Sequence, residues 1–149
     1  MLIGIDPILG PDLLATLRSM GHGDEIAFVD GNYPAQTHAK RLVRADGLHL
    51  VPLVRAALAV LPLDDDVDAP ILRACNANHP QTPDPIHQSV EALALAAAPG
   101  HTVAVLEGAA LYDRIRACHT IVATSEPALY GNVILRKGVI RLEGSDAAR

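Results

Sequence analysis

The stretch EIAFV (Glu25–Val29), followed at once by the turn sequence DGN at residues 30–32, decides the fold of this chain. Four of its five residues are apolar, and the run is far too short for a helix of ordinary length. Asp-Gly-Asn is typical of a turn that ends a strand. The stretch therefore predicts a short strand buried on both faces, as in a parallel sheet that helices cover.

Helix and strand patterns alternate along the rest of the chain. The first helical pattern begins after Gly10-Pro11 and ends before Gly21, the usual placement of proline and glycine at helix ends. This alternation predicts the α/β class, with one three-layer α/β/α domain over 1–143, a mostly parallel central sheet and a polar tail at 144–149. The expected elements are helices at 12–20, 51–61, 85–98 and 109–118, strands at 25–29, 40–45, 70–77, 102–106, 120–124 and 133–137, and a loop at 76–85.

The composition is apolar for a small domain. Of the 149 residues 50% are hydrophobic and 19% are charged, with a net charge of -5 and a mean hydropathy of +0.23. No apolar run is long enough to cross a bilayer and no basic stripe is present, so we expect neither a membrane nor a nucleic acid as partner. Surplus apolar surface instead predicts a homo-oligomer. The N-terminus lacks a signal-like sequence, and Cys75 and Cys118 lack metal-like spacing, which predicts a cytoplasmic protein with reduced thiols.

Familiar catalytic sequences of α/β proteins are missing. The chain has no glycine-rich dinucleotide fingerprint, no Gly-Lys-Ser/Thr and no Gly-x-Ser-x-Gly. Its seven histidines show no paired spacing, so we expect no metal site.

The sequence Gly21-His22-Gly23 stands out, because it places a histidine between two glycines where a helix gives way to a strand. Flanking glycines expose the imidazole and allow a ligand to approach closely. A capping turn, in which the histidine only interacts with the helix dipole, explains the sequence equally well.

Two further sequences are candidates for ligand binding. Asp30 ends a buried strand, at the edge of the sheet where open α/β folds bind ligands, although an ordinary Asx turn has the same sequence. Tyr130-Gly131-Asn132 offers an aromatic face, a hydroxyl and an amide before the last strand, and taken alone is more typical of a plain turn.

Taken in order, these sequences resemble the ribose pyranase / L-fucose mutarotase family, and the resemblance extends over residues 7–139. It rests on MGHGDEI at 20–26, Asp30 followed by Pro34, RADG at 44–47, LYDR at 111–114 and YGNVILRKGV at 130–139. RADG and the glycine at 131 are similar to the L-fucose mutarotase branch.

The resemblance implies an isomerase that interconverts anomers or ring forms of free monosaccharides without cofactor or metal. It implies ring-shaped homo-oligomers, commonly decamers of two pentamers, with pockets between subunits. By position, His22 matches the catalytic histidine, whereas Asp30, Tyr112, Tyr130, Gly131 and Asn132 match sugar-binding positions. The chain departs from the family at 107–110, where Glu-Gly-Ala-Ala replaces a segment that carries a basic residue.

Mutarotation requires one proton taken from the anomeric hydroxyl and one delivered to the ring oxygen, and an imidazole can do either near neutral pH. We expect His22 to protonate the ring oxygen, Asp30 to accept sugar hydroxyls and orient the imidazole, and Tyr112 to share the anomeric proton. L-fucose or a related sugar is the expected substrate. D-ribose pyranase activity, a non-catalytic sugar-binding or transport-associated protein and a purely structural oligomer are the alternatives.

An extended chain from residue 24 to residue 30 spans about 20 Å, which one monosaccharide cannot bridge. His22 and Asp30 of one subunit are therefore expected to serve different pockets, each completed by a neighbouring subunit.

Overall fold

Strand β1 (Glu25–Val29) lies inside a six-stranded sheet, and all five of its residues are buried. The computed structural model describes residues 1–141, so the polar tail expected at 144–149 lies outside the described residues. The strand order is β2-β5-β1-β6-β3-β4. The other elements are α1 (Pro11–Ser19), α2 (Ala35–His38), β2 (Leu42–Ala45), α3 (Leu50–Leu58), β3 (Ile71–Ala74), α4 (Pro85–Ala97), β4 (Val103–Leu106), α5 (Gly108–Ala117), β5 (Thr120–Thr124) and β6 (Val133–Arg136).

The sheet is mostly parallel, as the sequence predicts, and β6 is its antiparallel member. Strands β2, β5 and β1 run parallel, as do β3 and β4, whereas β6 pairs antiparallel with both β1 and β3. Residues 125–132 between β5 and β6 are too few for a crossover, which needs about a dozen residues or more. The chain therefore turns back at the edge where β5 ends, and Tyr130 and Asn132 stay at that edge.

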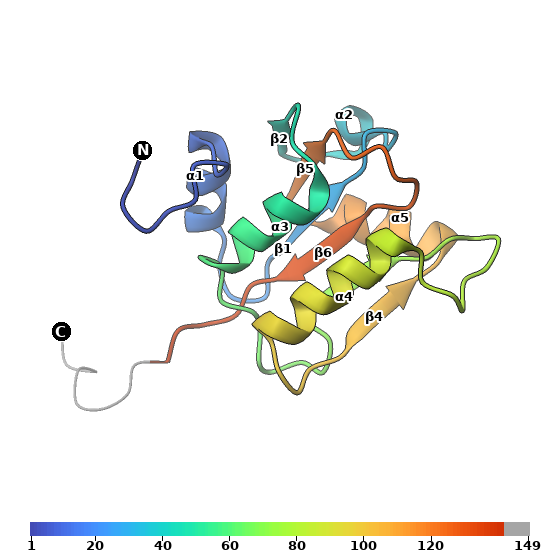
Figure 1. Cartoon of the computed structure of the whole chain (residues 1–149). Coiled ribbons are helices and arrows are strands. Elements are labelled where there is room, and N and C mark those ends of the chain that lie inside the picture. Colours follow the sequence, from blue (N-terminus) through green and yellow to red (C-terminus); the bar gives the residue numbers. More distant parts are fainter. Residues whose placement is uncertain (142–149) are drawn as a thin grey trace.

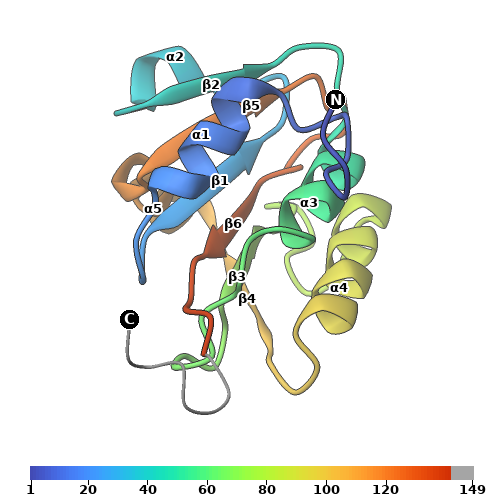
Figure 2. The ribbon, with the colours of Figure 1, turned by 90° about the vertical axis from the view of Figure 1, so that its left-hand side faces the viewer.

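Helices cover both faces of the sheet, which confirms the three-layer α/β/α expectation (Figures 1 and 2). Ile26 and Phe28 of β1 belong to one core cluster, together with buried residues of α1, α3 and α4. Ala27 and Val29 point to the opposite face and pack in a second cluster with buried residues of α2 and α5. This alternation follows from the two-residue period of a strand. Burial on both faces explains why the central strands β1 and β5 are mostly apolar.

Each predicted helix and strand is present, with ends shifted by a few residues. Helix α2 was not predicted, because a four-residue turn after Pro34 is too short to show a helical period. Within residues 1–141, no helix is long and apolar enough to cross a membrane.

The segment 62–64 is pressed against the end of β6. The Asp64 amide donates to the Arg136 carbonyl at 3.1 Å, and the Gly138 amide donates to the Pro62 carbonyl at 2.8 Å. A Cβ atom added to Gly138 would lie 2.6 Å from the Asp64 Cα and would also meet the Leu63 carbonyl. Gly138 thus allows the close approach that fixes the position of Asp64.

We expect Gly138→Ala to destabilise the protein by about 1–3 kcal/mol, because the backbone of 63–64 must move to admit a methyl group. Urea unfolding measures this change. Gly21→Ala is the matched control, since a Cβ at Gly21 meets only Asp24 Oδ2, at an ordinary contact distance of 3.7 Å, and its effect should stay below about 0.5 kcal/mol. Equal losses in the two variants would contradict the close-contact explanation.

Candidate functional site

A pocket of about 230 Å³ lies where β1 ends, between the 125–132 connection and the first turns of α5. Its volume is below the roughly 300–1,000 Å³ of pockets for drug-sized ligands and suits a smaller molecule. Asp30 is the one charged side chain among its lining residues. The lining comprises Asp30, Asn32, Tyr33, Leu111, Tyr112, Leu129, Tyr130 and Asn132.

The floor of the pocket is a buried pair formed by Asp30 and Asn132, which are 5% and 6% exposed. The Asn132 amide nitrogen donates to Asp30 Oδ2 at 3.0 Å, and the Asp30 backbone amide donates to Asn132 Oδ1 at 3.2 Å. The Asn32 amide donates to the second carboxylate oxygen of Asp30 at 2.9 Å. The Asx turn that the sequence left as an alternative is thus present, and its carboxylate also lines the pocket.

Tyr130 is held in an unusual backbone conformation by a buried histidine. Its φ of 60° lies in the left-handed region, which costs energy for a residue other than glycine. His87 Nδ1 accepts the Asp84 amide at 3.1 Å, so Nε2 carries the hydrogen and donates to the Tyr130 carbonyl at 3.0 Å. A Cβ at Gly131 would lie 3.1 Å from the Ala128 carbonyl, so a side chain at this position would crowd the turn.

Aromatic rings form one wall of the pocket. The Tyr33 and Tyr112 rings lie 5.2 Å apart between centroids, and both are within 6 Å of the His38 ring. The Tyr33 hydroxyl and His38 Nδ1 are hydrogen-bonded at 3.0 Å. Burial raises the pKa of Tyr33 to about 12, so its hydroxyl stays protonated at neutral pH. Tyr112 is 39% exposed and lies at the rim.

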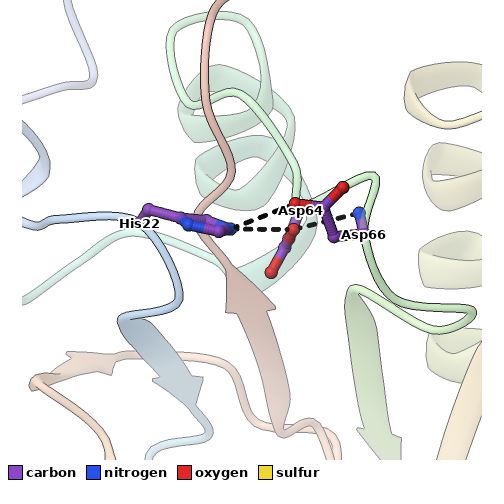
Figure 3. Close-up of side chains that lie close together, drawn as sticks. All are labelled: His22, Asp64 and Asp66. Atoms are coloured by element: carbon purple, nitrogen blue, oxygen red, sulfur yellow. Dashed lines mark hydrogen bonds and ion pairs between the residues drawn. The ribbon is translucent and has the colours of Figure 1, made fainter.

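His22 lies at the opposite edge of the sheet, before β1 begins (Figure 3). Its Nε2 is 3.2 Å from Asp64 Oδ1 and 3.8 Å from Asp66 Oδ2, and 46% of its side chain is exposed. Gly23 adopts a φ of 82°, and its amide donates to the Lys137 carbonyl at 2.8 Å. The glycine after His22 therefore permits the turn, and the imidazole projects from it into solvent.

Asp64, unlike His22, is almost fully buried. Its Oδ2 accepts Arg136 Nε at 2.7 Å, and this hydrogen bond holds the pKa of Asp64 at about 2 although burial acts to raise it. His22, Asp64 and Asp66 place their ligand atoms within 4.8 Å of one another, the single such group with metal-binding spacing within residues 1–141. Of the two carboxylate oxygens of Asp64, Oδ2 already accepts a hydrogen bond from Arg136.

Asp30, Tyr112, Tyr130 and Asn132 thus surround one pocket, with Gly131 in the turn beside it, whereas His22 lies apart. Within one chain the imidazole contacts Asp64, so the expectation that Asp30 orients it does not hold there. Sequence reasoning missed Asn32, Tyr33, Leu111 and Leu129 in the lining and His87 behind it. Only Asn32 and Tyr33 carried a usable signal, because they follow Asp30 in the same turn.

Comparisons with known proteins agree on one family. A model described as the RbsD / FucU transport protein family matches residues 3–140. A Haemophilus influenzae (strain PittGG) protein named L-fucose mutarotase is 39% identical over 141 residues, which cover 93% of this chain and 97% of that protein. The fucose mutarotase of Mus musculus is 40% identical over 147 residues, covering 93% and 95%. The crystal structure of the fucose mutarotase of Streptococcus pneumoniae in complex with L-fucose has a TM-score of 0.85 at 36% identity, covering 94% of this chain and all of that one.

We expect Asn132→Asp to destabilise the protein by about 2–4 kcal/mol at pH 8, because it sets two buried carboxylates against each other. Repulsion raises the pKa of the pair above its unfolded value, so the folded state binds more protons and stability is lost as the pH rises. Urea unfolding at pH 5 and pH 8 measures this trend. The double variant Asp30→Asn/Asn132→Asp restores one charge and one amide and should recover most of the loss. A double variant as unstable as the single one would contradict the pairing.

Proposed function

Because this chain belongs to the RbsD / FucU transport protein family, we propose that it is a carbohydrate isomerase, a mutarotase of free monosaccharides that acts on L-fucose or a related sugar. The observation that carries this proposal is identity of 39–40% over nearly the whole chain to proteins named L-fucose mutarotase or fucose mutarotase. The structural likeness to a mutarotase in complex with L-fucose supports it further.

We assign sugar binding to the pocket around Asp30. A carboxylate accepts hydrogen bonds from sugar hydroxyls, and the amide of Asn132 both donates and accepts. The rings of Tyr112 and Tyr130 offer apolar faces for the C–H side of the sugar ring. With Asp30 as the single charge in the lining, the pocket favours a neutral, hydroxyl-rich ligand over an anionic one.

We propose that each complete site is shared between subunits of a ring-shaped homo-oligomer, a decamer of two pentamers. The separation of His22 from the Asp30 pocket supports sharing, because an imidazole at the far edge cannot reach a sugar bound in its own chain. Apolar side chains at the pocket rim support an interface there, since Leu129 is 63% exposed and Tyr112 is 39% exposed. Two unpaired, buried cysteines, Cys75 and Cys118, fit our proposal of a cytoplasmic location.

In the proposed reaction, His22 from one subunit meets the sugar in the pocket of its neighbour. Its imidazolium delivers a proton to the ring oxygen, the bond from C1 to that oxygen breaks, and the anomeric hydroxyl loses its proton as the C1 carbonyl forms. That proton passes to the imidazole of His22, which is neutral after its own proton transfer, so the imidazolium is restored. The hydroxyl of Tyr112 shares the anomeric proton as a hydrogen-bonding relay. Rotation about the C1–C2 bond followed by the reverse steps closes the ring on the other face. Protons balance over the cycle, and no electron transfer is required.

Two other functions fit particular observations. D-ribose would also satisfy a small hydroxyl-binding pocket. A non-catalytic sugar-binding protein is favoured by residues 107–110, which contribute no basic side chain to the pocket.

Saturation-transfer NMR between the α and β signals of L-fucose tests the proposal. Catalytic amounts of the protein should speed anomer exchange, and His22→Ala should slow the catalysed rate by about 10²–10⁴-fold, the usual contribution of a positioned proton donor. D-ribose is the second sugar in the panel.

His79→Ala is the matched control, because His79 is also a loop histidine with 46% side-chain exposure near a carboxylate. It should keep the wild-type exchange rate. If the wild-type protein binds the sugar but does not speed anomer exchange, the protein is a non-catalytic sugar-binding protein and the mutarotase proposal is wrong. If the His22→Ala variant keeps the exchange rate, His22 has no part in the mechanism.

A further inference from the structure

We propose that Asp64 is the positioning residue for His22, and that Nδ1 of this imidazole is the nitrogen that exchanges protons with the sugar. Arg136 fixes Asp64, Asp64 binds the Nε2–H group, and the opposite side of the ring is thereby presented to the substrate. The inference rests on the proposed function and adds to it the residue that sets the ring orientation and the reacting atom.

Asp64 has a fixed position, because contacts on both its backbone and its side chain hold it. Its amide donates to the Arg136 carbonyl, and Leu63 forms an antiparallel bridge with Lys137 beside it. Its side chain is 1% exposed, with Oδ2 accepting Arg136 Nε at 2.7 Å and Oδ1 accepting the Asp66 amide at 3.1 Å. A carboxylate with so many partners cannot rotate freely.

Arg136 is held in turn by further ion pairs. Its guanidinium lies 3.7 Å from a carboxylate oxygen of Glu25, which is buried and accepts two hydrogen bonds from Arg114 of α5. Positive and negative side chains therefore alternate along one network that ends at His22. Its members, in order, are Arg114 of α5, Glu25 of β1, Arg136 of β6 and Asp64 in the loop. The imidazole is exposed, yet its partner belongs to a rigid network.

The charge of Asp64 decides the tautomer of His22. The hydrogen bond from Arg136 keeps the pKa of Asp64 at about 2, so at neutral pH this carboxylate only accepts hydrogen bonds. Nε2 of His22, 3.2 Å from Asp64 Oδ1, must then carry the hydrogen. In the neutral ring the free lone pair lies on Nδ1, and this atom has no hydrogen-bond partner among the described residues.

One ring orientation therefore serves both halves of the reaction. In the neutral form Nδ1 accepts a proton, and in the imidazolium form the same atom donates it, while Nε2–H stays bound to Asp64 throughout. Asp66 cannot replace it, because its side chain is 58% exposed and lies 3.8 Å from Nε2.

The tautomer can be measured directly on the wild-type protein. Long-range ¹H–¹⁵N correlation NMR at about pH 8, where an ordinary imidazole is neutral, reports which ring nitrogen carries the hydrogen. The spectrum of His22→Ala identifies the His22 signals by their absence. We expect the Nε2–H form. A predominant Nδ1–H form would overturn the proposal, and this measurement requires neither activity nor a variant of Asp64.

Asp64→Asn tests the consequence for catalysis, with Asp66→Asn as the matched control. An asparagine can donate to Nε2, so we expect a shift toward the Nδ1–H form and a loss of about 10²-fold or more in kcat, with KM for the sugar nearly unchanged. Asp66→Asn should stay within about fivefold of the wild type, as expected for an exposed pair.

The proposed function and this inference fail in different ways. If the wild type does not speed anomer exchange, or His22→Ala retains the rate, the proposed function is wrong whatever the tautomer. If His22 is required but Asp64→Asn keeps the wild-type kcat and tautomer, the positioning role is wrong. Should Asp64→Asn fail to fold, the wild-type tautomer decides.

Discussion

Strand β1 joins the turn that carries His22 at one edge of the sheet to Asp30 at the other edge, and the extended backbone from residue 24 to residue 30 spans about 20 Å. All five strand residues are buried between two layers of helices, so the strand cannot bend to bring them together. The proposed acid–base group, His22, and the proposed sugar-binding group, Asp30, are therefore separated within one chain by the core itself. A functional site that needs both groups requires a second copy of the chain.

The antiparallel strand β6 organises both edges. Its short connection from β5 places Tyr130 and Asn132 beside Asp30 at one edge. Its other end brings Arg136 to Asp64, and hence to His22, at the opposite edge. If a crossover connection made β6 parallel to its neighbours, Tyr130 and Asn132 would no longer lie beside Asp30, and Arg136 would no longer lie beside Asp64. Within residues 1–141, the one strand that departs from the parallel pattern thus positions both the pocket around Asp30 and the side chain of His22.

The elements of this fold were predictable from sequence because they depend on local patterns. Short, mainly apolar runs, helical spacing and the placement of Gly or Pro mark the described strands and helices except the one-turn α2. The clustering of Asp30 with Tyr130 and Asn132 was foreseen only by resemblance, since residues about 100 positions apart carry no mutual signal in one sequence. His87 and Asp64 were missed for the same reason. Both residues matter through their contacts, which the sequence does not show. The sequence Asp64-Asp65-Asp66 is typical of a solvated acidic loop, whereas in the structure Asp64 is buried.

Complementation between two inactive variants tests the shared site most directly. His22→Ala and Asp30→Asn chains are co-expressed in equal amounts, mixed oligomers are purified, and the exchange rate between L-fucose anomers is measured. If each pocket takes His22 from one subunit and Asp30 from another, half of the pockets gain an intact His22 and half of those an intact Asp30, so activity returns to about one quarter of the wild-type value. If both residues act within one chain, no pocket regains both, and mixed oligomers that stay inactive would contradict the account.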